Sequence, residues 1–259
     1  MINAKDSQNT FYILDKKTDV PIVFIHGVGL NHKIWEPQIN VFENTFLAYD
    51  ILGHGKTPLD KENLSFDDFS NQLINLIDEL NIRRIHLVGF SIGSLIARNF
   101  ASKYSDRLES LILLCSIFRR TEKQQQIVKD RFELAKKSKS LSKQALKRWF
   151  TDEYLEKNPN TYNKISSILE QNSMENFLKI YELFVNHKDD EQFEKIKTKT
   201  LIMTGEGDIG STPEMSINLS KVINNSNVKI ISKGKHLCSI ECADDVNMAI
   251  KKHIQNDWA

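Results

Sequence analysis

Short apolar, β-branched segments alternate with amphipathic helical segments along most of this chain, and this alternation narrows the choice of fold more than any other feature. Six segments have the length and composition of buried strands: 21–26, 46–50, 85–88, 108–114, 200–203 and 228–231. Helices are expected between or after them, including 92–104, 213–222 and 244–254. This order predicts an α/β fold with a mostly parallel central sheet flanked by helices on both faces.

One long stretch interrupts the alternation. Residues 119–190 contain no convincing strand and consist of helix-forming residues with scattered aromatic side chains. The 259 residues of the chain suit one large domain that carries an insertion. We therefore predict a core domain formed by 1–118 and 191–259, and a helical cap formed by 119–190.

The strongest functional motif is Gly89-Phe90-Ser91-Ile92-Gly93, which follows the strand at 85–88 and opens the helix at 92–104. In this context the G-x-S-x-G pattern predicts a nucleophile elbow. The turn is tight, so small residues must flank the serine where the backbone segments pack closely. The Ser91 hydroxyl would then lie at a helix N-terminus, where unpaired N–H groups favour negative charge.

A serine hydroxyl needs a base to become a nucleophile, and the base needs an acid to orient it. The strand at 200–203 leads into a loop that contains Asp208, and the strand at 228–231 leads into a loop that contains His236. We predict that Ser91, His236 and Asp208 form a catalytic triad. Glu206 is the nearest alternative to Asp208.

A second glycine-containing segment, His26-Gly27-Val28-Gly29, follows the strand at 21–26. Its backbone can face the serine, so the N–H groups of Val28 and Ile92 are predicted to form the oxyanion hole. Because the donors are backbone groups, the side chains at these two positions matter little to that role.

Five segments carry a resemblance to a known family: HGVGLNHKIWEPQI (26–39), YDILGHGKTP (49–58), GFSIGSLIARNFA (89–101), TGEGDIGSTPEM (204–215) and KHLCSIE (235–241). The chain resembles the α/β-hydrolase superfamily over nearly its whole length, and specifically the 3-oxoadipate enol-lactonase and carboxylesterase branch. The resemblance implies hydrolysis of a small-molecule carboxylic ester or lactone through an acyl-enzyme, with no metal or organic cofactor. It also implies that His26 and His54 shape loops.

Other functions remain open within this resemblance. Similar relatives cleave methyl esters, carbon–carbon bonds of diketones, or amides, and some are cofactor-free peroxidase-like enzymes. A binding or receptor protein with little turnover would also keep the fold. The serine at position 91 disfavours the haloalkane dehalogenase and epoxide hydrolase relatives, because they have an aspartate there.

The charge of the chain is nearly balanced overall, with a formal net charge of +1. This argues against nucleic acid as a dedicated partner, since phosphate neutralisation needs concentrated Lys and Arg. However, residues 119–148 contain eleven basic residues and three acidic ones. This basic stretch is either a solvated helix face or a lid that attracts an anionic substrate, an acidic carrier protein or an anionic membrane surface.

The remaining features predict a reduced, cytoplasmic protein without a membrane span. No run approaches the roughly 18 apolar residues that a membrane span requires, and the N-terminus has no apolar signal region. Three cysteines, Cys115, Cys238 and Cys242, are too few for a disulfide framework. Cys238 and Cys242 lie near His236 in sequence, but structural zinc needs four ligands, so no metal site is predicted.

Overall fold

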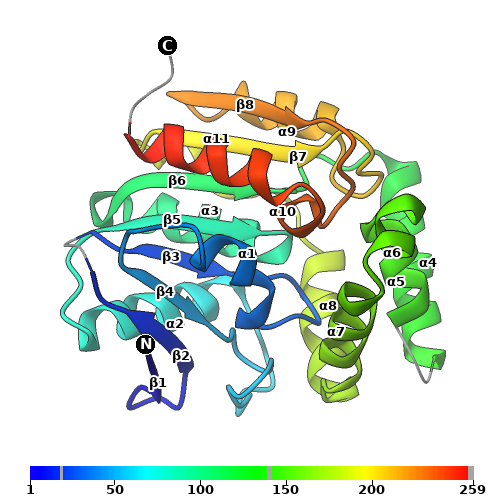
Figure 1. Ribbon diagram of the computed structural model, residues 1–259, viewed down its shortest axis with the longest axis horizontal. Coiled ribbons are helices and arrows are strands. Elements are labelled where there is room, and N and C mark those ends of the chain that lie inside the picture. Colours follow the sequence, from blue (N-terminus) through cyan, green and yellow to red (C-terminus); the bar gives the residue numbers. More distant parts are fainter. Residues whose placement is uncertain (18–19, 139–141, 256–259) are drawn as a thin grey trace.

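The computed structural model describes residues 1–17, 20–138 and 142–255. Its centre is an eight-stranded sheet with the order β1-β2-β4-β3-β5-β6-β7-β8 (Figure 1). The strands are β1 Ile2–Lys5, β2 Phe11–Asp15, β3 Ile22–Ile25, β4 Phe46–Tyr49, β5 Ile85–Phe90, β6 Leu108–Leu114, β7 Thr200–Gly205 and β8 Ser226–Ile231. β3 to β8 pair in parallel, whereas β1 and β2 are antiparallel.

The predicted α/β fold with a mostly parallel sheet is confirmed, and each of the six predicted strands is present. The antiparallel pair β1 and β2 was not predicted. β1 lies at the edge of the sheet, and its residues are largely exposed, so its sequence carries little of the apolar signal that marks a buried strand.

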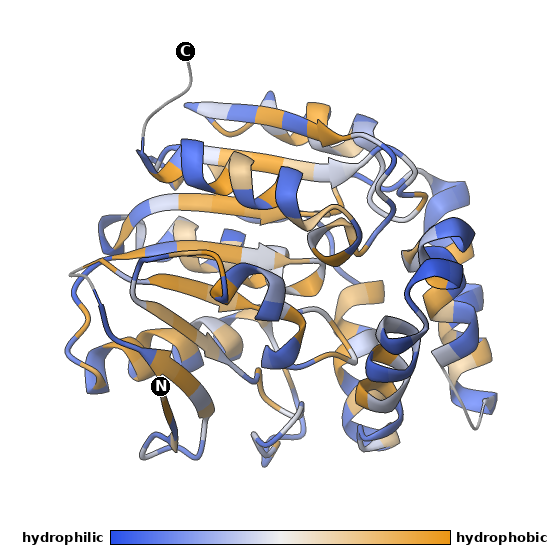
Figure 2. Cartoon of the chain, in the orientation of Figure 1, coloured by the Kyte–Doolittle hydropathy of each residue, from blue (hydrophilic) through white to orange (hydrophobic). Residues whose placement is uncertain are grey.

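Helices cover both faces of the sheet. The helical elements of the core are η1 His32–Trp35, α1 Glu36–Ile39, α2 Phe66–Glu79, α3 Ile92–Lys103, η2 Ser105–Arg107, η3 Phe193–Lys195, α9 Pro213–Ser220, α10 Cys238–Glu241 and α11 Ala243–Gln255. Alternate residues of β3 point to opposite faces, so Phe24 packs in a cluster with α11 and Val23 packs in a cluster with α2, α3 and α9. Figure 2 shows the apolar strands between these two helical layers.

The described residues between β6 and β7 form five helices in the stretch for which the sequence predicts a cap. They are α4 Glu122–Lys137, α5 Ser142–Trp149, α6 Asp152–Lys157, α7 Pro159–Glu170 and α8 Met174–Val185. They lie beyond the carboxyl ends of the parallel strands, on the right of Figure 1. α4 packs on α8, and α5 packs on α7. We call α4 to α8 the cap.

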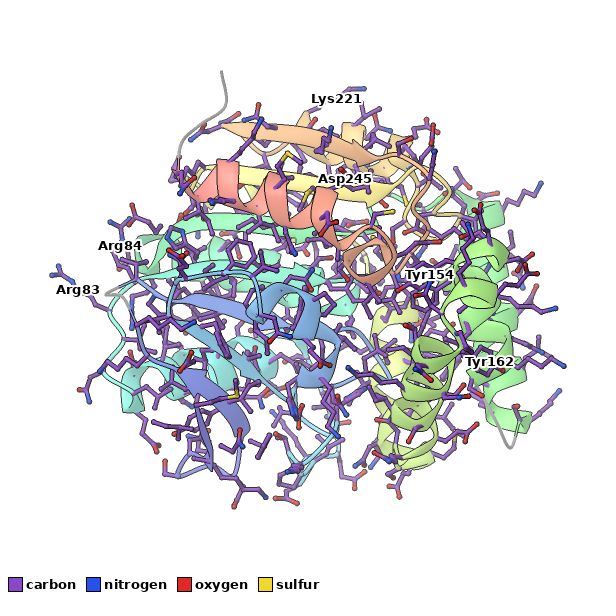
Figure 3. The ribbon with its side chains drawn as sticks, in the orientation of Figure 1. Arg83, Arg84, Tyr154, Tyr162, Lys221 and Asp245 are labelled. Carbon is purple, nitrogen blue, oxygen red and sulfur yellow. The ribbon has the colours of Figure 1, made fainter. Side chains whose placement is uncertain are left out.

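Aromatic side chains hold the cap against the core. Phe150 is fully buried in the core cluster, and its ring stacks on that of Tyr154 with the centroids 5.3 Å apart. Tyr154 and Tyr162 pack against the same cluster (Figure 3). These apolar contacts attach the cap to the core.

No helix in the described part of the chain is both long enough and apolar enough to cross a membrane.

Candidate active site

The turn between β5 and α3 is strained and tightly enclosed. Ser91 has φ 55° and ψ −119°, a backbone conformation that residues other than glycine rarely adopt. A Cβ atom at Gly89 would lie 2.2 Å from the Gly93 carbonyl oxygen, and a Cβ at Gly93 would lie 2.5 Å from the Ile25 carbonyl oxygen. Both positions must therefore be glycine, because only glycine lets these backbone segments approach so closely. The close packing fixes the direction of the Ser91 side chain.

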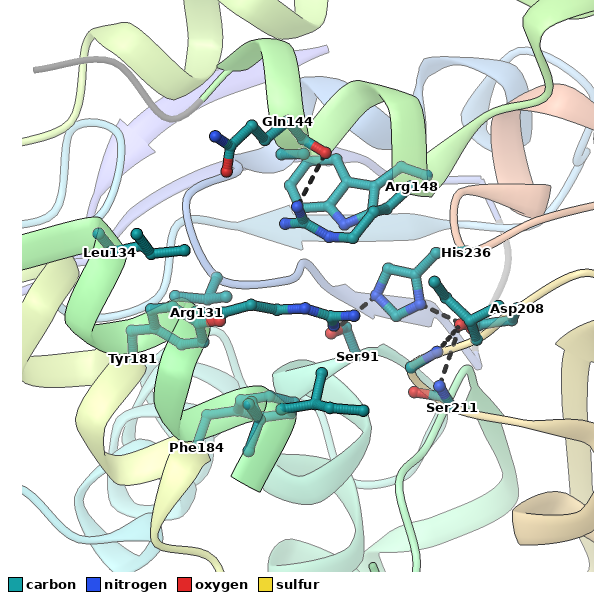
Figure 4. Close-up of a pocket in the computed structure, with 18 of the residues that line it drawn as sticks. Ser91, Arg131, Leu134, Gln144, Arg148, Tyr181, Phe184, Asp208, Ser211 and His236 are labelled. Carbon is teal, nitrogen blue, oxygen red and sulfur yellow. Dashed lines mark hydrogen bonds and ion pairs between the residues drawn. The ribbon is translucent and has the colours of Figure 1, made fainter. Parts of the chain in front are cut away.

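Three strand ends bring Ser91, His236 and Asp208 together. Ser91 follows β5, Asp208 follows β7, and His236 lies on the loop after β8. His236 Nε2 lies 3.2 Å from Ser91 Oγ, and His236 Nδ1 lies 2.7 Å from Asp208 Oδ2. Figure 4 shows this chain of hydrogen bonds. The arrangement can move the serine proton onto an imidazole that a carboxylate orients.

Backbone groups hold the Asp208 carboxylate in place. Its Oδ1 accepts hydrogen bonds from the N–H groups of Gly210, at 2.8 Å, and Ser211, at 3.0 Å. Burial raises the pKa of Asp208, but the interaction with His236 and these two hydrogen bonds outweigh it and hold the pKa below its ordinary value. Asp208 is therefore an anion at neutral pH.

Glu206, the alternative acid, faces away from this arrangement. Its Oε2 accepts a hydrogen bond from the Lys233 N–H at 3.2 Å and lies 3.4 Å from Ser232 Oγ. The structure thus places Asp208, and not Glu206, beside His236.

The His236 ring lies in a largely apolar setting. Its centroid is 5.0 Å from that of Phe90 and 6.2 Å from that of Trp149. Burial lowers the pKa of His236, but the charge and hydrogen bond of Asp208, together with a smaller contribution from Cys115, outweigh burial and raise the pKa to about 10. The pair consequently favours the imidazolium, the form that His236 must take after it accepts a proton.

The two predicted oxyanion donors lie next to the serine. Ile92 begins α3, so its N–H has no acceptor within the helix. Val28 and Ser91 line the same cavity, and the Val28 N–H has no acceptor among the described residues. A Cβ atom at Gly27 would lie 3.3 Å from Ser91 Cβ, which shows how closely the loop after β3 approaches the elbow.

Two buried histidines fix the shape of that loop, in agreement with the role that the resemblance implies. His54 Nε2 accepts a hydrogen bond from the Gly29 N–H at 2.8 Å, and His26 Nε2 accepts one from the Ile51 N–H at 3.1 Å. Burial lowers the pKa of His26 to about 4 and that of His54 to about 3. Both rings are neutral at pH 7 and can accept these hydrogen bonds.

A cavity of about 470 Å³ lies above Ser91 and is covered by the cap. Ser91, Asp208 and His236 form part of its wall. Leu134, Trp149, Leu169, Phe177, Tyr181 and Phe184 are among the cap residues that supply apolar and aromatic surface. Arg120, Arg131, Lys137 and Arg148 supply cationic groups (Figure 4 labels two of them). The volume suits a small molecule.

Sequence reasoning did not single out the cap residues that line this cavity. Trp149 was grouped with the aromatic residues of the cap, and the arginines were counted only as part of the basic stretch 119–148. No motif surrounds them. Their place in the wall depends on how α4, α5 and α8 pack, and neither periodicity nor spacing reports that packing.

Two groups of potential metal ligands occur in the described part of the chain. One is Cys115, Asp208 and His236, and the other is His187, Asp189 and Glu191. Neither group contains Cys238 or Cys242, the two cysteines near His236 in sequence for which a metal site was considered. In the first group, His236 and Asp208 already bond to each other.

Comparisons with known proteins agree with this architecture. A family model described as "alpha/beta hydrolase fold" matches residues 20–242. Among curated proteins, the (E)-2-((N-methylformamido)methylene)succinate hydrolase of Acinetobacter baylyi is 26% identical over 255 residues, which cover 96% of this chain and 95% of that protein. The 3-oxoadipate enol-lactonase 2 of the same organism is 23% identical over 252 residues, which cover 96% of this chain and 94% of that protein.

Among solved structures, the enol-lactonase from Burkholderia xenovorans LB400 superposes with a TM-score of 0.82. It is 22% identical in sequence, and the match covers 95% of this chain and 97% of that chain. At this level of identity the likeness concerns the fold.

Proposed function

The chain belongs to the α/β hydrolase fold family, and from this we propose that it is a serine hydrolase that cleaves a carboxylic ester or lactone of a small molecule. The observation that carries the proposal is the hydrogen-bond chain from Ser91 through His236 to Asp208 in the wall of a cavity that the cap helps to form. The similarity to hydrolases, among them an enol-lactonase, supports it.

In the first half of the reaction, His236 removes the Ser91 proton while Ser91 Oγ attacks the acyl carbon. Asp208 holds the imidazole and stabilises its cation. The N–H groups of Val28 and Ile92 donate to the oxygen that gains negative charge. The alkoxide or enolate then leaves and takes the proton from His236, which gives an ester between Ser91 and the acyl group.

In the second half, water attacks the acyl carbon of this ester, and His236 accepts a proton from the water. The bond to Ser91 Oγ breaks, His236 returns the proton to the serine, and the carboxylic acid departs. Apart from the attacking water, every group that these steps need is supplied by the chain itself. A carbon–carbon bond hydrolase or a peroxidase-like enzyme would use the same three residues, so the nature of the cleaved bond has to be tested with substrates.

We expect the protein to release p-nitrophenol from short p-nitrophenyl esters and to form one covalent adduct with a fluorophosphonate reagent, located on Ser91 by mass spectrometry. The reagent phosphonylates a serine whose proton a neighbouring base removes. An enol-lactone and a vinylogous diketone, assayed side by side, should give turnover of the lactone only. Turnover of the diketone alone would identify a carbon–carbon bond hydrolase. If neither a covalent adduct nor turnover is observed, the result would favour a binding protein that keeps the fold.

The raised pKa of His236 predicts a pH profile. His236 must be neutral to accept the Ser91 proton, so kcat/KM for a neutral ester should rise with pH along a one-proton curve. Because Asp208 stabilises the charged form, the midpoint should lie above 6.5. Initial rates between about pH 5 and about pH 11 measure it. A midpoint below 6.5 would contradict the coupling of His236 to Asp208.

A further inference from the structure

The basic stretch 119–148 divides into two groups. Arg120, Arg131, Lys137 and Arg148 line the cavity, whereas others, such as Lys129, are exposed and lie outside its wall. Lys139 lies outside the described residues. Asp208 is the one acidic residue among the described lining residues, and its charge is engaged by His236. The cavity therefore has a surplus of positive charge that comes from the cap.

Arg120 is one of the cationic groups in this wall, and its guanidinium is held in place by several contacts. Its Nη1 donates to the carbonyl oxygens of Phe184, at 3.1 Å, and Val185, at 3.2 Å, and the guanidinium lies over the Phe184 ring at 4.4 Å from the centroid. Its Nη2 is buried and has no hydrogen-bond partner among the residues that the structure describes. Asp189 favours the charged form of Arg120, but this carboxylate bonds to Arg98 Nη2 at 2.7 Å. A buried donor without an acceptor is costly, and a small shift of the Arg120 side chain, which lines the cavity, would let an anionic ligand supply that acceptor.

Arg131 and Arg148 extend the cationic wall toward the reacting groups. The Arg131 side chain forms no hydrogen bond or ion pair with another described residue, and Figure 4 shows it extending from α4 in the direction of Ser91 and His236. Arg148, on α5, donates to the Gln144 carbonyl oxygen at 2.8 Å, and no carboxylate pairs with it among the described residues.

These arginines are close enough to influence each other. Burial lowers the pKa of Arg148, and Arg131 lowers it further. Burial raises the pKa of Tyr181, while Arg148, Arg131 and Arg120 all oppose that shift. Three guanidinium groups thus act electrostatically on one tyrosine, and all four residues line the same cavity. Like charges repel strongly where water is scarce. A bound anion would attract each guanidinium group and so offset the repulsion between them.

We propose that the substrate carries a free carboxylate in addition to the bond that is cleaved, and that Arg120, Arg131 and Arg148 bind this carboxylate. The substrate is then a half-ester or lactone of a dicarboxylic acid, or an ester with a carboxylate on its leaving group. This inference rests on the proposed function. An arginine binds a carboxylate through two parallel hydrogen bonds, which also orients the substrate above Ser91. The concave position of the arginines favours a small anion over an acidic protein or a membrane surface.

Two pairs of esters test the proposal. Mono-p-nitrophenyl succinate and its methyl ester differ by one carboxylate on the acyl side, and 4-acetoxybenzoate and its methyl ester differ by one carboxylate on the leaving side. At least one anionic member should have a kcat/KM about ten times that of its neutral partner or more, the size expected of a charge-assisted hydrogen bond. No preference for either anionic ester would overturn the proposal.

Variants that each remove one positive charge distinguish the effect of the cavity arginines from that of the exposed basic residues. In Arg131→Gln or Arg148→Gln, the ratio of kcat/KM for the anionic ester to that for the neutral ester should fall about 10- to 100-fold. Lys129→Gln removes the same charge from the exposed side of α4, and the ratio should stay within about two-fold because an exposed charge is screened by salt. An equal loss in Lys129→Gln would mean that the field of the whole basic surface acts, and that no carboxylate site exists.

A binding measurement separates this proposal from the proposed function. Calorimetry with succinate and the Ser91→Ala protein requires no turnover. Succinate should bind with one site, and adding Arg131→Gln should weaken the affinity at least about ten-fold. Succinate binding without hydrolysis of any ester would refute the hydrolase and keep the carboxylate site. Hydrolysis of neutral esters with no succinate binding would refute the carboxylate site and keep the hydrolase.

Discussion

Replacing Ser91 with alanine is expected to lower kcat by about four orders of magnitude or more, because the members of a triad act as a unit and the remaining groups cannot form an acyl-enzyme. The fold should persist. Ser91 has the positive φ of the elbow, which alanine can also adopt when the same strand and helix hold it. Steady-state kinetics with a p-nitrophenyl ester and a thermal unfolding curve measure the two effects.

Ser102→Ala is the matched control for this experiment. Ser102 lies on the same helix, α3, and its hydroxyl donates to the Asn99 carbonyl oxygen at 2.8 Å, away from the cavity. This variant should keep its activity. Near-normal turnover in Ser91→Ala would end the serine-hydrolase interpretation.

The second large effect is expected at Asp208. Asp208→Asn should reduce kcat roughly 1,000- to 10,000-fold, because an asparagine amide can donate to His236 Nδ1 and thereby stabilise the wrong tautomer of the imidazole. Asp208 Oδ2 lies 2.7 Å from His236 Nδ1, so the variant changes the chemistry of that contact more than its geometry. The measurement is kcat for a neutral ester near the pH of maximum activity.

Glu206→Gln is the control for the choice of acid. Glu206 is two residues away on the same loop, and it bonds to the Lys233 N–H. Its replacement should change kcat little. If Glu206→Gln were the damaging variant and Asp208→Asn the mild one, the wrong carboxylate would have been assigned to His236.

The sheet and the triad geometry could be predicted because their signals are local. Each buried strand is a short apolar run, and each proposed catalytic residue lies a few positions after such a run. In a parallel sheet the carboxyl ends of strands share one edge, so the order of the motifs was enough to expect Ser91, Asp208 and His236 near one another. β1 escaped prediction because pairing at the sheet edge requires no apolar pattern, whereas β2 is apolar and buried and was missed although its sequence carries that signal.

The cavity wall could not be predicted, since it is a product of tertiary packing. Arg120 precedes α4, Arg131 lies on α4, and Arg148 lies near the end of α5. No helical spacing connects these three positions. They face the same cavity because α4 packs on α8 and α5 packs on α7. The charged residues of the stretch can be counted in the sequence. Which of their side chains face the cavity cannot be predicted from it.

The position of the cap in the chain has a consequence for how such a protein can change over evolutionary time. The cap enters after β6 and leaves before β7, so it interrupts no strand, and β6 and β7 still pair along Leu111–Leu114 and Thr200–Met203. Insertions at such connections are tolerated because they leave the buried backbone hydrogen bonds intact. The elbow, the histidine loop and the acid loop can therefore stay unchanged while the five helices above them vary, provided that this region keeps its apolar contact with the core through residues such as Phe150.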